Sequence, residues 1–194
     1  YGPNNAVITV GGDVNPKEVV KLVEKYFGII PRGPEVKNME SDPIVLGADR
    51  YISHVDRNIR FPALIMTYPT IPNMHSDEAP LDCLSEILGT GQSSYFFKKF
   101  VLTQKAIQAT VMHPAAELSG EFTLLVLPYP GQTLENFETE MRQVLDEFAE
   151  NGVSELDLLK FKANMESNFI DELASVSGKV SQLARYQFRF GNPN

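Results

Sequence analysis

The order of strand-like and helix-like segments constrains the fold of this chain most. Two strand-like segments, 51–55 and 63–68, lie next to each other, and a second pair, 107–112 and 121–127, follows a helical stretch. The last third of the chain reads as consecutive helices. Strands in adjacent pairs and helices in blocks are typical of antiparallel sheets, not of strict βαβ alternation. The sequence therefore predicts an α+β fold, a two-layer α/β sandwich of a mostly antiparallel sheet with helices on one face.

Capping residues and glycines mark where helices begin and end. A β-branched run over 6–10 predicts a short strand. Asn15 followed by Pro16 then predicts the start of a helix, which ends at Gly28. Apolar residues at helical spacing predict the later helices. These cover 77–88, 94–102, 134–148, 154–173 and 176–190.

The amino-acid composition between 31 and 47 predicts a linker, because three prolines and a glycine interrupt a polar stretch with little hydrophobic periodicity. We therefore expect a strand and helix over 1–30, a linker over 31–47 and a second module over 48–194. The chain begins at Tyr1 without an initiator Met and stops abruptly at Asn194. We expect it to be a piece of a longer protein.

Charge and cysteine content exclude several classes of function. The chain has 194 residues and a formal net charge of −8, which disfavours nucleic acid and anionic membranes as partners. Its single cysteine, Cys83, excludes an intrachain disulfide and a thiolate metal cluster. The apolar neighbours of Cys83 predict a small buried thiol, not a nucleophile.

No metal site follows from the histidines. His54, His75 and His113 are separated by 21 and 38 residues. Neither H-E-x-x-H nor H-x-x-E-H occurs, so no two imidazoles have the helical spacing that binds one zinc ion. We interpret all three as hydrogen-bonded or solvent-facing residues.

The most site-like local sequence is the glycine-rich turn over 89–94, Gly-Thr-Gly-Gln-Ser-Ser. It lacks the lysine-bearing ending of a phosphate-binding loop, so we interpret it as a helix end followed by a serine cap. Lys98 and Lys99 are too few for a nucleic-acid patch. The acidic residues in and just after the helix predicted over 134–148 are interpreted as its solvent-exposed face. These are Glu138, Glu140, Asp146, Glu147 and Glu150.

Several segments in order resemble the pitrilysin/insulinase family of inverted-motif zinc metallopeptidases. The resemblance covers nearly the whole chain, and it is specific through the order and spacing of its motifs. The matching segments are Tyr1-x-Pro3-Asn4-Asn5, Tyr26-Phe27-Gly28, His75-Ser76-Asp77-Glu78-Ala79-Pro80-Leu81, Leu88-Gly89-Thr90-Gly91, Ser119-Gly120-Glu121-Phe122 and Ala184-Arg185-Tyr186-Gln187.

The resemblance implies that catalysis lies elsewhere. In this family, zinc is held by the two histidines of H-x-x-E-H and a later glutamate, all in the first module, which would precede Tyr1. Residues 1–30 then resemble the last strand and helix of that zinc module. Residues 48–194 resemble the non-catalytic second module, truncated at its C-terminal end. We therefore assign no catalytic, metal-binding or substrate-binding residue and no cofactor to this chain, and we expect zinc in the parent protein.

One departure from the family pattern concerns substrate contact. Substrate-binding modules of the family carry an Arg and then a Tyr after the glycine-rich turn, at positions that correspond to Val101 and Gln108 here. Neither residue offers a guanidinium or a phenol. The resemblance thus implies a module that directly follows the zinc module, in preference to a degenerate copy.

The family also implies partners. Its modules pair around a closed chamber that holds a polypeptide, so we expect the preceding zinc module and a second half or subunit as partners. In an isolated chain, the strand over 6–10 is expected to fill the vacant edge of the sheet, within one chain or in a strand-swapped homodimer. Exported bacterial members of the family imply a periplasmic or cell-envelope location.

Two alternatives remain open from the sequence. The parent protein can be a catalytically inactive relative that serves assembly, scaffolding or peptide binding. Alternatively, the chain is an unrelated binding domain, which predicts a fold other than the paired-strand sandwich.

Overall fold

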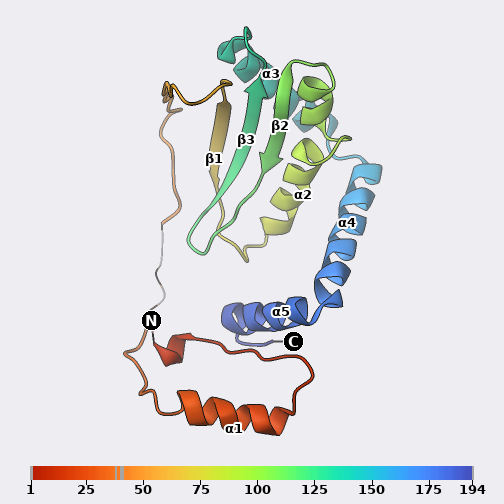
Figure 1. The fold of residues 1–194 in the computed structure, drawn as a ribbon. Coiled ribbons are helices and arrows are strands. Elements are labelled where there is room, and N and C mark those ends of the chain that lie inside the picture. Colours follow the sequence, from red (N-terminus) through yellow and green to blue (C-terminus); the bar gives the residue numbers. More distant parts are fainter. Residues whose placement is uncertain (1, 38, 40–41, 194) are drawn as a thin grey trace. The chain divides into compact units, whose positions relative to one another are not determined.

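The computed structural model describes residues 2–37, 39 and 42–193, which form two compact units (Figure 1). The terminal unit comprises Tyr1–Asn38 and Lys162–Asn194, and the central unit comprises Met39–Phe161. Tyr1 and Asn194, the first and last residues of the sequence, lie outside the described residues.

The central unit contains an antiparallel sheet of three strands in the order β1-β3-β2. These are β1 (Leu64–Thr70), β2 (Ala106–Met112) and β3 (Gly120–Pro128). The strands predicted over 63–68, 107–112 and 121–127 are thus confirmed. β3 is central because it pairs with β1 on one side and with β2 on the other.

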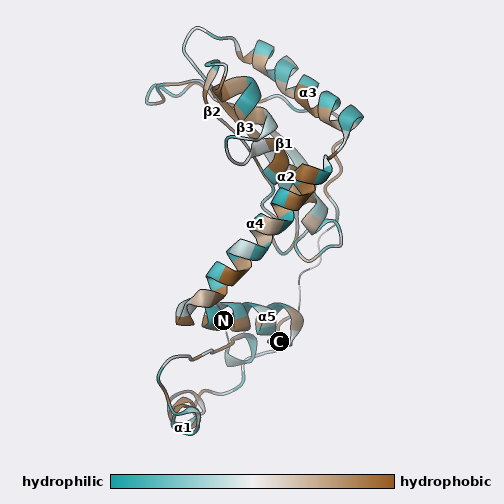
Figure 2. Cartoon of the chain, turned by 90° about the vertical axis from the view of Figure 1, so that its right-hand side faces the viewer, coloured by the Kyte–Doolittle hydropathy of each residue, from teal (hydrophilic) through white to brown (hydrophobic). Residues whose placement is uncertain are grey.

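Helices α2 (Glu78–Gly89) and α3 (Leu134–Asn151) pack on one face of this sheet. Alternate strand residues point into the layer between sheet and helices, and hydrophobic and hydrophilic residues alternate along α3 (Figure 2). The predicted two-layer α+β sandwich is confirmed. Its most completely buried hydrophobic side chains are Leu88, Phe96, Phe100, Leu124, Val126 and Met141.

The glycine-rich turn joins α2 to the core through close backbone contact. A Cβ on Gly89 would lie 2.0 Å from the backbone nitrogen of Val111, so only glycine lets α2 approach β2 this closely. Gly91 adopts a positive φ of 77°, and the Ser94 hydroxyl donates to its carbonyl oxygen at 2.8 Å. The turn is therefore structural, as its residue pattern indicates.

The short helix predicted over 94–102 contains a π-helical turn, η2 (Phe97–Val101). Phe100 within it is fully buried and packs against the ring of Phe137 in α3, with 5.6 Å between ring centroids. The wider π-helical turn thus occurs where an aromatic side chain packs into the core.

Two predicted strands are wrong. Residues 51–55 and 6–10 form no part of any sheet within the described part of the chain. Ile52 and Val55 are each 89% exposed, which is far from the half-buried state of a sheet residue. A β-branched run becomes a strand only when a second strand hydrogen-bonds to it, and local sequence does not supply that partner.

In the terminal unit, helices α1 (Pro16–Phe27) and α5 (Val176–Phe190) begin at side-chain caps. The Asn15 carboxamide oxygen accepts the Lys17 N–H at 3.0 Å, and the Ser175 hydroxyl oxygen accepts the Gly178 N–H at 2.9 Å. Gly28 caps the end of α1. The unit also contains the C-terminal part of α4 (Glu155–Ala174) and a 3-10 turn, η1 (Pro3–Asn5).

The Asn4 side chain joins the two ends of the N-terminal segment 4–34. Its carbonyl oxygen accepts the Gly33 N–H at 3.0 Å, and its amide nitrogen donates to the Pro34 carbonyl at 3.0 Å. One side chain thus holds together residues that lie about 30 positions apart, and α1 lies within the loop so closed. In the described part of the chain, no helix combines the length and apolar character needed to cross a bilayer.

Candidate functional site

The three histidines lie in different settings. His54 is exposed, whereas His75 Nδ1 accepts the Asp77 N–H at 3.2 Å in the turn before α2. The side chain of His113 is completely buried. Among the described residues, no three His, Cys, Asp or Glu side chains are grouped closely enough to bind one metal ion. The assignment of no catalytic or metal-binding residue to this chain stays a prediction.

His113 connects three elements of the central unit. Its Nδ1 lies 2.8 Å from Asp82 Oδ1 on α2, and its Nε2 lies 3.2 Å from Thr70 Oγ1 on β1. This order of carboxylate, imidazole and hydroxyl resembles a nucleophile relay. Because the ring is completely buried, the arrangement satisfies a polar residue at the edge of the core and offers no imidazole to a substrate. The continued alternation of Ala109, Val111 and His113 is the sequence signal that places His113 on the core face.

The cysteine and two of the acidic residues considered in the sequence are buried or paired with other side chains. Cys83 is buried within α2, as predicted. Glu140 pairs with Lys105 at 2.7 Å, and Glu138 accepts hydrogen bonds from Arg142. The hydrogen bond to Glu138 is the main cause that raises the pKa of Arg142 above its ordinary value.

The positions that correspond to the family's substrate-contacting pair lie on neighbouring elements. Val101 ends η2 and is half-buried, whereas Gln108 is exposed on β2. Their side chains are a short aliphatic group and an amide, so neither brings a positive charge to this edge of the sheet. The interpretation that the substrate clamp is absent stays a prediction.

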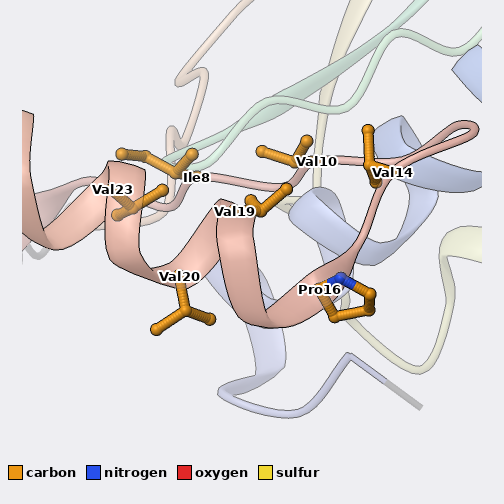
Figure 3. A pocket seen from close by; sticks show the side chains of 7 residues that line it. All are labelled: Ile8, Val10, Val14, Pro16, Val19, Val20 and Val23. Carbon is orange, nitrogen blue, oxygen red and sulfur yellow. The ribbon is translucent and has the colours of Figure 1, made fainter.

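An aliphatic hollow of about 320 Å³ lies in the terminal unit between α1 and the extended segment before it (Figure 3). We call it the valine groove. Among the described residues, no charged side chain lines it. Its lining residues are Ile8, Val10, Val14, Pro16, Val19, Val20 and Val23.

Helix α1 is amphipathic, yet none of its residues is buried. Its apolar side includes Leu22, Tyr26 and Phe27, each at least half exposed, and its polar side includes three lysines. An apolar helix face normally packs against another layer. This face therefore has the character of a docking surface.

A second hollow, of about 490 Å³, lies on the face of the sheet opposite α2 and α3. We call it the sheet hollow. It combines aliphatic and proline side chains with two hydroxyls and one carboxylate. Its lining residues are Ile44, Leu46, Thr67, Pro69, Pro114, Ala116, Ser119, Gly120 and Glu121.

The sequence profile of the peptidase M16 inactive domain matches residues 1–165. The zinc protease PqqE of Helicobacter pylori is 27% identical over 195 residues, which cover 96% of this chain and 43% of PqqE. The chain thus spans less than half the length of this curated relative.

Solved structures share the fold. A protease from Helicobacter pylori aligns with a TM-score of 0.75 at 22% identity, over 92% of this chain and 44% of that one. A peptidase M16 inactive domain from Pseudomonas fluorescens gives a TM-score of 0.74 at 17% identity, over 91% and 41%. The periplasmic protease PqqL of Escherichia coli gives 0.66 at 12% identity, over 94% and 20%.

The profile match excludes one of the two alternatives that the sequence left open. It covers most of the chain, so an unrelated binding domain is the wrong hypothesis. The resemblance to the pitrilysin/insulinase family is confirmed. The chain belongs to the pitrilysin-type M16 peptidase family, as one of its inactive, non-catalytic domains.

Proposed function

We propose that this chain forms part of the wall of a chamber that holds polypeptide substrate in a zinc endopeptidase. The zinc ligands and the water-activating glutamate then belong to a module that precedes Tyr1. Two observations support the proposal. The matching domain family is described as inactive, and a relative of more than twice this length is a zinc protease.

The observation that carries the proposal is the N-terminal segment 6–10, which pairs with no strand in the described part of the chain, together with the exposed helix α1. Residues 6–10 enter no helix or sheet in the described part of the chain, and α1 exposes its apolar face beside them. A strand with a flanking amphipathic helix can extend a neighbouring sheet while the helix covers that sheet's face. We infer that residues 1–30 complete the preceding zinc module, and that 31–47 link it to the module over 48–194.

The same features predict how the parts assemble. The valine groove accepts the aliphatic side chains of the zinc module, and a second half or subunit closes the chamber around the polypeptide. Without the zinc module, residues 6–10 are free to pair with the open sheet edge of another copy, which gives a strand-swapped homodimer. A periplasmic or cell-envelope location is proposed by analogy with PqqL, which is a periplasmic protease.

The coding sequence upstream of Tyr1 tests the zinc assignment directly. An H-x-x-E-H motif followed by a later glutamate is expected there. The complete protein is then expected to cleave casein and to lose this activity in a chelator. If the motif is absent and the complete protein is inactive, the chamber wall of a peptidase is the wrong assignment, and the scaffold or peptide-binding alternative replaces it.

Substitution of Val20 tests the docking role. Val20 is 55% exposed and lines the valine groove. In the complete protein, Val20→Asp is expected to reduce peptidase activity at least tenfold, because the carboxylate would be buried against the zinc module. Lys17→Asp on the polar side of α1 is the control and should retain activity. Equal activity of both variants with the unsubstituted protein would contradict the docking role.

A further inference from the structure

Glu121 places a carboxylate with no partner in the sheet hollow. It lies opposite Pro69 in the pairing of β3 with β1, and it is an exposed residue that lines the hollow. Within the described residues, the Glu121 carboxylate takes part in no ion pair or hydrogen bond, whereas Glu140 and Glu138 pair with Lys105 and Arg142. The hollow therefore presents a negative charge that the described residues leave without an ion-pair partner.

Apart from the hydroxyls of Thr67 and Ser119, the residues that line the hollow around Glu121 are apolar. Ile44 and Leu46 contribute aliphatic side chains, and Pro69 and Pro114 contribute rings without a backbone donor. An apolar wall suits an alkyl stem, and a carboxylate suits an ammonium or guanidinium group at its tip. Lysine and arginine side chains combine these two parts in one group.

The charge of the central unit favours the same ligand. Met39–Phe161 contains eight Lys and Arg against eighteen Asp and Glu, a net charge of −10, whereas the terminal unit has a net charge of +2. The negative charge of the chain is thus concentrated in the unit that contains the sheet hollow. Such an excess attracts cationic groups and raises their local concentration.

The backbone beside the hollow indicates a polypeptide and not a free amine. Residues 44–46 belong to no helix or strand, and within the described residues their N–H and C=O groups make no backbone hydrogen bond. A segment whose backbone donors and acceptors are free can pair with an extended peptide strand. A peptide can therefore hydrogen-bond to 44–46 while one of its side chains enters the hollow.

We propose that the sheet hollow binds a lysine or arginine side chain of an extended polypeptide, with Glu121 pairing its positive charge. This inference rests on the proposed function, because it gives the chamber wall a preference within its substrate class. It assigns the recognition to Glu121 and to the apolar walls around it.

The test measures binding of two heptapeptides to the 194-residue chain by NMR titration. The peptides are identical except that one has lysine and the other norleucine at the centre. We expect the lysine peptide to bind at least threefold more tightly. Glu121→Gln should remove this difference and leave binding of the norleucine peptide unchanged. n-Butylamine should bind at least threefold more weakly than the lysine peptide, because it cannot pair with residues 44–46.

A matched control separates local pairing from general charge. Glu135→Gln removes one carboxylate from the first turn of α3 and leaves the sheet hollow intact. It should keep the preference for lysine. Equal binding of the two peptides, an equal loss in both variants, or equal affinity for butylamine would each overturn the inference. These outcomes are distinct from failure of the proposed function, because an inactive parent protein without the zinc motif can still carry a chain that prefers the lysine peptide.

Discussion

At the scale of single residues, close contacts and buried polar groups decide the stability of the central unit. Gly89 lets the end of α2 approach the backbone of β2, and His113 connects α2, β1 and the end of β2 by two hydrogen bonds. Both residues act through atoms that lie far from them in sequence. Their importance therefore becomes visible only in the folded chain.

Substitution of Gly89 should separate α2 from β2. In Gly89→Ala, the new Cβ would lie 2.0 Å from the Val111 nitrogen, which is backbone and cannot rotate away. We expect the free energy of unfolding to fall by about 2 kcal/mol or more, measured by urea denaturation. Gly47→Ala is the control, because nothing lies within 4 Å of its added Cβ. An equal effect of the two substitutions would contradict the close-contact argument.

Removal of the His113 ring should leave Asp82 and Thr70 without their partner and create a cavity beside Phe122. We expect His113→Ala to lower the free energy of unfolding by about 2–4 kcal/mol. His54→Ala, at an exposed position, should change it by no more than about 0.5 kcal/mol. The thermal unfolding midpoints of both variants measure these effects. An unchanged midpoint for His113→Ala would refute the stabilising role of the His113 hydrogen bonds to α2 and β1.

At the scale of elements, helices follow from the sequence more directly than strands. Asn15 and Gly28 mark helix ends in the sequence, and the structure begins and ends α1 at these caps. The strand pattern over 6–10 is equally clear, but these residues enter no sheet among the described residues. A helix satisfies its hydrogen bonds within itself, whereas a strand needs a distant partner.

The cap of α1 gives a test at this scale. Asn15→Ala removes the oxygen that accepts the Lys17 N–H, whereas Asn15→Asp keeps an acceptor there. We expect Ala to destabilise the first turn of α1 by about 1 kcal/mol and Asp to leave it nearly unchanged. Amide hydrogen exchange over Pro16–Phe27 measures the difference. Equal exchange rates in the two variants would show that this cap does not stabilise the helix.

At the scale of the whole molecule, the chain has a core in its central unit and a terminal unit whose helix α1 has no buried residue. Exposed apolar surface of this kind belongs to a part that docks onto another. A docking partner for α1 is consistent with the family of this chain, because the curated relative PqqE is more than twice as long. This supports the proposal that the domain acts together with a neighbouring part of a longer protein.

The isolated chain should have no hydrolytic activity of its own. We expect the purified 194-residue protein to contain far less than one zinc ion per chain and to leave casein and the insulin B chain intact. Metal analysis and peptide digestion measure both quantities. One bound zinc ion per chain, or cleavage that a chelator suppresses, would contradict the non-catalytic assignment.

The sequence by itself determined the helices, three of the strands, the α+β class and the family, because caps, periodicity and ordered motifs are local signals. Only the tertiary structure decided which β-branched runs join a sheet, which histidine is buried, and that Glu121 lies in a hollow without a partner among the described residues. Each of these depends on contacts between residues far apart in the chain. Such contacts are set by packing of the whole unit, which local sequence does not specify.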